Sequence, residues 1–165
     1  MKRVLPLLLL LPFFALGQDM NNEKLEEIYT AVSDSINGSV GAWQFYLKEI
    51  PIISITDKKH NRMRIMSPIR DANLLADDMI KAALVANFHT ALDVKYAVSD
   101  GILWSVFTHP LKELSQHQVE DAVSQVYYAN INFGTSFTST SLSFPSSIQK
   151  ENQKEKFKEL ELRKS

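Results

Sequence analysis

The sequence predicts an α+β domain in which three helices accompany an antiparallel sheet of five strands. Two kinds of periodicity support this prediction. Apolar residues recur every three to four positions in three segments, and they alternate with polar residues in five short runs. The order along the chain is helix, three strands, helix, two strands, helix. Because short polar turns join consecutive strands, we expect the strands to pair antiparallel.

The first helix is expected over residues 23–36. Asn21 or Asn22 can cap its start. We expect Asn37-Gly38 to end it, since glycine adopts a positive φ without a Cβ clash. Asn37-Gly38-Ser39 also matches a glycosylation sequon, but the helix-end interpretation is preferred. The apolar side chains at helical spacing are Leu25, Ile28, Tyr29, Val32 and Ile36.

Three strand-like runs follow. In residues 43–47 large apolar side chains alternate with polar ones, which is the pattern of a strand with one buried face. Residues 52–56 are rich in β-branched side chains. Residues 62–66 alternate again, and the polar stretch 57–61 between these two runs predicts the turn of a hairpin. We expect Ser67-Pro68 to end this part of the sheet.

The second helix is expected over residues 73–88. Asp77 and Asp78 lie near its start, where the helix dipole favours negative charge. Its apolar stripe is wide and rich in alanine, and such a stripe suits close packing on a sheet or against another subunit. The stripe contains Leu75, Met79, Ala82, Ala83 and Ala86, and Leu74 and Leu84 broaden it.

A second hairpin is predicted around Asp100-Gly101, a dipeptide that favours a two-residue turn. Both faces of the strand that follows this turn carry large apolar groups, so we expect it to be central or partly covered by a partner. One face carries Ile102, Trp104 and Val106, and the other carries Leu103 and Phe107.

The last helix is expected to start at Ser115, because Ser115 and Gln118 match a capping box. Gly134 is the expected stop. Residues 135–147 are rich in serine and threonine and are interpreted as exposed or weakly strand-forming, with Leu142 and Phe144 as anchors.

Residues 1–17 match a secretory signal peptide, with a basic start, an apolar core and the ending Ala15-Leu16-Gly17. The apolar core is shorter than the roughly 20 residues that span a bilayer. We therefore expect cleavage after Gly17 and an exported mature chain, periplasmic or secreted. No second long apolar run occurs, so no transmembrane anchor is expected in the mature chain.

The mature chain is interpreted as one domain over residues 18–147 and a charged tail over 148–165, helical or disordered. The domain carries ten basic against fifteen acidic residues, hence a charge of −5, whereas the signal and the tail carry +2 each. No broad basic field results, so nucleic-acid binding is not expected. The absence of cysteine excludes a disulfide framework, a thiolate metal site and a cysteine nucleophile.

The motifs of catalysis are missing, so we expect no enzyme, no cofactor and no metal. There is no G-x-S-x-G and no phosphate-binding glycine loop. His117 and Asp121 share a helix face, but a closed metal site needs two further ligands that no zinc pattern supplies. His60, His89 and His109 are interpreted as solvated. The alternative is a small-ligand binder or a metal-assisted hydrolase that uses these histidines.

What remains is apolar surface. Five short strands cannot hide both faces under three helices, and a sheet with spare apolar surface binds an extended peptide or dimerises. Core packing is the competing explanation for each side chain taken singly. The candidate partner-binding residues are Trp43, Phe45, Ile53, Trp104 and Phe107.

Four stretches resemble the YbjN-type family of bacterial sensory-transduction regulators, which has a type III secretion chaperone-like fold. They are residues 62–69, the helix ending at Leu84–Phe88, the hairpin Asp93–Trp104 and the closing Asn132-Phe133-Gly134. The resemblance covers residues 23–144. It implies a homodimer and non-enzymatic binding of a protein or peptide, with no catalytic residues. Because secretion chaperones of this kind work in the cytoplasm, the expected export favours an envelope peptide-binding or regulatory role.

Overall fold

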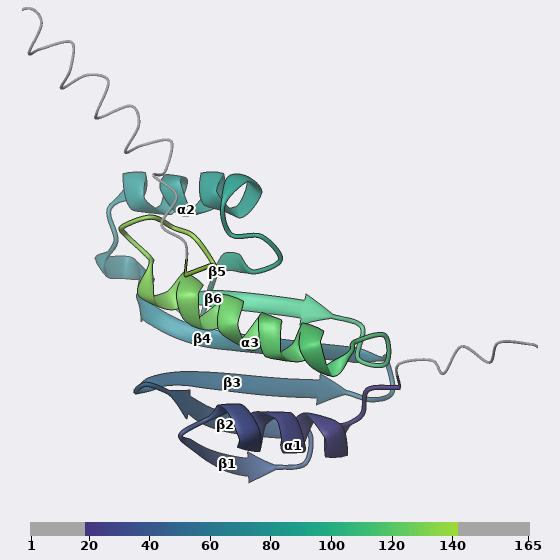
Figure 1. Ribbon diagram of the computed structural model, residues 1–165. Coiled ribbons are helices and arrows are strands. Elements are labelled where there is room, and N and C mark those ends of the chain that lie inside the picture. Colours follow the sequence, from purple (N-terminus) through teal and green to yellow (C-terminus); the bar gives the residue numbers. More distant parts are fainter. Residues whose placement is uncertain (1–18, 142–165) are drawn as a thin grey trace, which may run out of the picture.

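A six-stranded antiparallel sheet organises residues 19–141, the part of the chain that the computed structural model describes (Figure 1). The order of strands across the sheet is β1-β2-β3-β4-β6-β5. The elements are α1 (Asn22–Val32), β1 (Ser35–Ser39), β2 (Ala42–Leu47), β3 (Ile50–Asp57), β4 (Arg62–Asp71), the 3-10 helix η1 (Ala72–Leu74), α2 (Asp77–His89), β5 (Lys95–Ser99), β6 (Ile102–His109) and α3 (Gln116–Ile131). The predicted α+β class and the three helices are confirmed. The predicted signal segment, the tail, Leu142 and Phe144 lie outside the described residues.

Strand β1 is the element that the sequence prediction missed. Helix α1, capped by Asn21, ends at Val32, so the predicted extension to Ile36 is wrong. Ile36 instead lies opposite Phe45 in the β1–β2 pair, and Gly38 lies opposite Trp43. Gly38 has a φ of +124°, and a Cβ there would lie 2.3 Å from the backbone oxygen of Ala42. This glycine therefore allows two strands to approach closely instead of ending a helix.

Strand β4 is longer than predicted. It continues through Ser67 and Pro68 to Asp71, so the expected end at Ser67-Pro68 is wrong. The pairing register with β6 shifts just after Pro68, which is a bulge of the kind that accommodates proline in a sheet. The Asn130 side-chain amide of α3 donates hydrogen bonds to the Pro68 carbonyl oxygen (2.9 Å) and to Ser67 Oγ (2.7 Å). A contact distant in sequence thus supports the backbone at the bulge.

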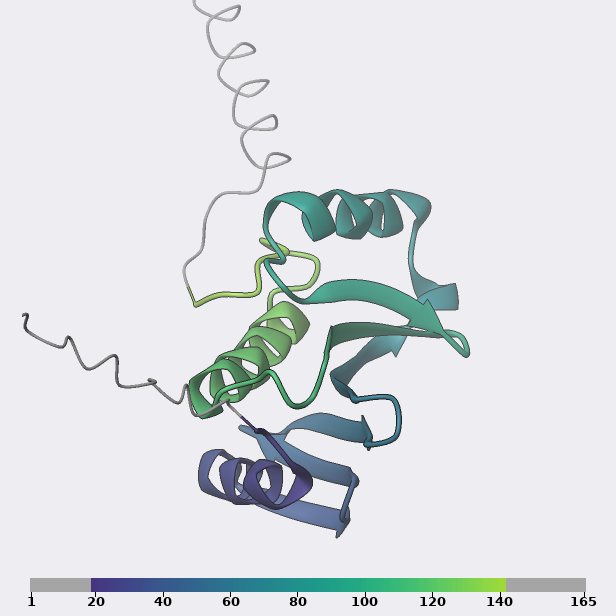
Figure 2. The same cartoon turned by 90° about the vertical axis from the view of Figure 1, so that its right-hand side faces the viewer.

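The hydrophobic core lies between the sheet and helices α1 and α3, which cover the same face (Figures 1 and 2). The Tyr29 ring of α1 stacks on Phe45 with 4.6 Å between ring centroids, and a 2.7 Å hydrogen bond joins its hydroxyl to the buried Ser54 Oγ. Burial raises the pKa of the Tyr29 phenol well above its usual value, so the phenol is neutral in the folded protein. Helix α3 begins with the predicted capping box of Ser115 and Gln118.

Helix α2 lies beside the edge strand β5, not over the middle of the sheet (Figure 1). Its alanines Ala82, Ala83 and Ala86 are buried, as the alanine-rich stripe predicted. The Asn87 side chain accepts a hydrogen bond from the Tyr96 backbone N–H (2.7 Å) and donates one to the Tyr96 carbonyl oxygen (3.0 Å). Asn87 therefore satisfies backbone groups of an edge strand, which protects that edge from further pairing.

We predict that Asn87→Ala lowers the free energy of unfolding by about 1–3 kcal/mol, because the partly buried backbone groups of Tyr96 lose both partners. Urea denaturation measures the change. Asn37→Ala is the matched control, since Asn37 is exposed on β1 and should change stability by less than about 0.5 kcal/mol. Equal effects of the two substitutions would contradict this role of Asn87.

Candidate functional site

The face of the sheet opposite α1 and α3 is not covered by any helix of residues 19–141 (Figure 2). We call it the open face. Ile53, Met66 and Val106 lie in one row across β3, β4 and β6, and Pro68 and Trp104 form the adjacent pair. All five side chains are partly exposed. They make a continuous apolar strip, named here the open-face strip, across three central strands.

Strand alternation explains how β6 contributes to this strip. Leu103, Ser105 and Phe107 are buried on the helix-covered face. Because successive side chains of a strand point to opposite faces, Trp104 and Val106 lie on the open face. The Trp104 indole N–H donates a hydrogen bond to the Ser99 carbonyl oxygen (3.3 Å), which anchors one end of the indole on the hairpin. The Trp104 side chain remains partly exposed to solvent.

The five predicted partner-binding residues divide between the two faces. Ile53 and Trp104 lie on the open face, in the open-face strip. Trp43, Phe45 and Phe107 lie in the core and are only 2%, 0% and 6% exposed. A partner cannot reach these three side chains in the folded protein, so Ile53 and Trp104 are the two accessible members of the predicted set. Alternation shows which residues share a face, but it does not show which face the helices cover.

Two arginines border the strip on β4. Arg62 and Arg64 are exposed, and they alternate with the buried Met63 and Ile65, so they lie on the open face. Across residues 19–141 the ion pairs are Lys58–Glu23 and His60–Asp57, and neither includes an arginine. A hollow of about 420 Å³, lined by both arginines and by Ile55 and Thr108, lies at this end of the open face.

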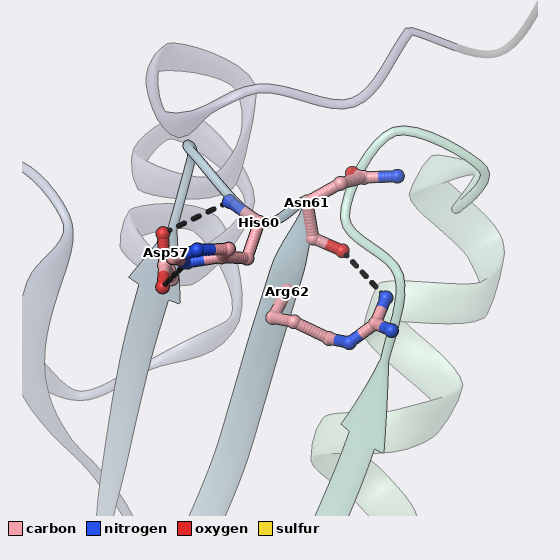
Figure 3. A network of polar contacts seen from close by, with 4 residues as sticks. All are labelled: Asp57, His60, Asn61 and Arg62. Carbon is pink, nitrogen blue, oxygen red and sulfur yellow. Dashed lines mark hydrogen bonds and ion pairs between the residues drawn. The ribbon is translucent and has the colours of Figure 1, made fainter.

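Asp57 is opposite Arg62 in the β3–β4 pair, yet its carboxylate binds within its own turn (Figure 3). His60 donates from its side-chain Nδ1 (2.6 Å) and from its backbone N–H (3.1 Å) to the two oxygens of Asp57. These hydrogen bonds, chiefly the one from the side chain, hold the pKa of Asp57 below its usual value. Arg62 donates to the backbone oxygen of Asn61 at 3.2 Å, so the turn leaves both arginines without a carboxylate partner among the described residues.

The same turn is tied to the loop that precedes α3. The Asn61 side chain donates to both carboxylate oxygens of Glu113 (3.0 and 2.9 Å) and accepts from the Lys112 backbone N–H (2.9 Å). The hydrogen bonds from Asn61 are the main reason that the pKa of Glu113 lies below its usual value. The turn next to the arginines is thus held in place by contacts 52 residues away in sequence.

The histidines considered as metal ligands do not converge with acids in the described part of the chain. His109 and His117 line a polar hollow of about 440 Å³ together with Asp121. The carboxylate of Asp121 accepts from Gln125 Nε2 at 2.7 Å, and the same nitrogen donates to Asp93 at 3.1 Å. Residues 19–141 hold no group of three or more histidine, aspartate or glutamate side chains placed to bind a metal ion.

Exposed apolar side chains are also concentrated on α2 and on the segments next to it, and we call this set of residues the α2 surface. It carries six of the nine large apolar side chains that are exposed in residues 19–141. Phe88 is the extreme case, with 87% of its surface exposed. The six residues are Leu74, Leu84, Val85, Phe88, Leu92 and Val98. No helix in the described part of the chain is long and apolar enough to cross a membrane.

Comparison with known proteins gives no relative in sequence. No family model matches the chain, and no curated protein matches it.

The fold does match solved structures. One is a chain of the HopA1–SchA chaperone–effector complex, with a TM-score of 0.53 and 8% identity, covering 68% of this chain and 94% of that one. Another is from the Yersinia pestis type III secretion chaperone SycH in complex with a fragment of YscM2 (TM-score 0.52, 10% identity, 68% and 98% covered). A third is from the ExsC–ExsE complex (TM-score 0.54, 10% identity, 70% and 96% covered). The chain therefore has the α+β fold of type III secretion chaperones, as its element order predicted.

Proposed function

We propose that this protein is a non-catalytic polypeptide-binding protein whose open face receives a segment of a partner protein. The observation that carries the proposal is the open-face strip, which spans three central strands with no described helix over it. Such a strip is costly to leave in water, and its burial by a partner supplies binding free energy. Trp104, which is anchored at its indole nitrogen, has the character of a binding hot spot.

The structural relatives support a polypeptide as the partner. The HopA1–SchA structure is a chaperone–effector complex, and the SycH structure contains a fragment of YscM2. These proteins share only the fold with this chain, at 8% and 10% identity. The chemistry of the open face supports the same kind of partner, because partly exposed apolar side chains with flanking arginines suit a segment of mixed apolar and polar residues.

We also propose that the protein acts outside the cytoplasm, after cleavage near Gly17. The basic start and the short apolar core of residues 1–17 support this location. The resemblance to the YbjN-type family supports a regulatory purpose for the binding. An exported protein with this fold would bind its partner either in the periplasm or outside the cell after secretion.

The α2 surface is proposed as the interface of a homodimer. The resemblance implies a homodimer, and six exposed apolar side chains on one helix and its flanks are more than scattered surface residues. The α2 surface lies beside β5, at the edge of the sheet, whereas the open-face strip is centred on β3, β4 and β6. A dimer formed there would leave both open faces free for partners.

We predict that Trp104→Ala lowers capture of a partner from an envelope extract by about tenfold, because it removes the largest side chain of the open-face strip. Affinity capture with quantitative mass spectrometry measures the loss. Val40→Ala is the control, since Val40 is exposed in the β1–β2 turn, away from the strip. Equal capture by wild type and Trp104→Ala, with unchanged unfolding midpoints, would contradict the proposal.

We predict a dimer in light scattering of the wild-type protein at micromolar concentration, and a monomer for Phe88→Asp. A charge in the centre of an apolar interface lacks a partner and is costly to bury. Trp104→Ala should remain dimeric, because Trp104 lies on the open face. A monomeric wild-type protein, or a dimeric Phe88→Asp variant, would refute the α2 interface.

A further inference from the structure

We propose that Arg64 makes the open face selective for partner segments that carry a carboxylate next to apolar side chains. This inference rests on the proposed function, because it assigns the chemistry of the segment that the open face receives. It adds to that function a charged recognition residue, which the sequence patterns did not single out.

The position of Arg64 is the first step. Arg64 is paired with Ile55 on one side and with Thr108 on the other, so it lies in the row adjacent to Ile53, Met66 and Val106. Arg64 and Met66 are two residues apart on one strand and hence about 7 Å apart on the same face. The Arg64 side chain therefore leaves the sheet at the end of the open-face strip. Its guanidinium can reach a partner that lies along the strip.

The second step is that Arg64 has no acidic partner in the described part of the chain. Neither ion pair of residues 19–141 includes it, and no hydrogen bond of its guanidinium occurs there. Asp57 lines the same hollow of about 420 Å³ as Arg64, but its carboxylate accepts a hydrogen bond from His60 and not from Arg64. Arg62 lies two residues away on the same face, so two positive charges adjoin without a bound carboxylate between them.

Charge complementarity then identifies the occupant. The domain over residues 18–147 carries −5, so the two arginines form a local positive site and not part of a broad basic field. A guanidinium binds a carboxylate through two parallel hydrogen bonds, and apolar neighbours strengthen this interaction by excluding water. A segment with glutamate or aspartate beside apolar residues would place its acid over Arg64 and its apolar groups over the strip. The net negative charge of the domain disfavours nucleic acid and anionic membranes as occupants.

Two synthetic peptides test this selectivity. One alternates valine with glutamate, and its match has glutamine in place of every glutamate. Trp104 fluorescence reports binding, since the chain has two tryptophans and the other, Trp43, is buried. We expect the acidic peptide to bind the wild-type protein about tenfold more tightly than the neutral one at low salt. Arg64→Gln should abolish this difference in affinity between the two peptides. High salt should reduce the difference, because salt screens the interaction between exposed charges.

Arg70→Gln is the matched control. Arg70 is an exposed arginine of the same strand, but it lies beyond the bulge, opposite Leu103, on the other face of the sheet. It should keep the preference for the acidic peptide. Equal binding of both peptides, or a preference that survives in Arg64→Gln, overturns the inference and leaves the proposed function in place.

Two further outcomes are decisive. Failure of both peptides to bind, together with undiminished partner capture by Trp104→Ala, overturns the inference and the proposed function together. Phosphatidylglycerol vesicles serve as a competing anionic surface. Binding to these vesicles that depends on Arg64 and exceeds binding of the acidic peptide would assign the site to a membrane and overturn the inference.

Discussion

The packing of α1 and α3 against a single face of the sheet is the constraint on which the site depends. Side chains alternate along each strand, so this packing divides every strand into a buried set and a set on the open face. On β6 the division separates Phe107 from Trp104. The aromatic stack of Tyr29 and Phe45 holds α1 to the covered face. The open-face strip consists of the side chains that alternate with the buried ones and so point away from α1 and α3.

Helix α2 does not relieve this asymmetry, because it lies at the sheet edge. Asn87 binds the backbone of Tyr96, and the Thr90 hydroxyl donates to the Phe137 carbonyl oxygen at 2.8 Å, so both β5 and the chain after α3 hold the helix there. The position of α2 beside β5 protects that edge of the sheet from pairing with a further strand. It also leaves apolar side chains on α2 without cover. The molecule therefore presents two sets of exposed apolar side chains, the open-face strip and the α2 surface.

Features that depend on local chemistry could be predicted from the sequence. The capping box at Ser115 and the turn at Asp100-Gly101 both occur as expected, the latter with a positive φ at each residue. Strand β1 was missed because the need for glycine at position 38 arises only when β1 pairs with β2, where a Cβ would clash with the Ala42 carbonyl oxygen. The continuation of β4 through Pro68 is supported by hydrogen bonds from Asn130, 62 residues away. For the site, the sequence grouped Ile53 and Trp104 with Trp43 as apolar strand residues, and it could not tell which of them the helices cover. A binding role for Arg64 could not be predicted from the sequence, because a charged side chain on an alternating strand is ordinarily solvated.

Site-specific photocrosslinking tests most directly whether the open face is the binding surface. A benzophenone side chain replaces Ile53 in the open-face strip in one variant and Ala31, exposed on α1, in the other. We expect the Ile53 variant to form a covalent adduct with the partner that the wild-type protein captures, and the Ala31 variant to form none. An adduct from Ala31 alone would place the partner on the helix-covered side and contradict the account.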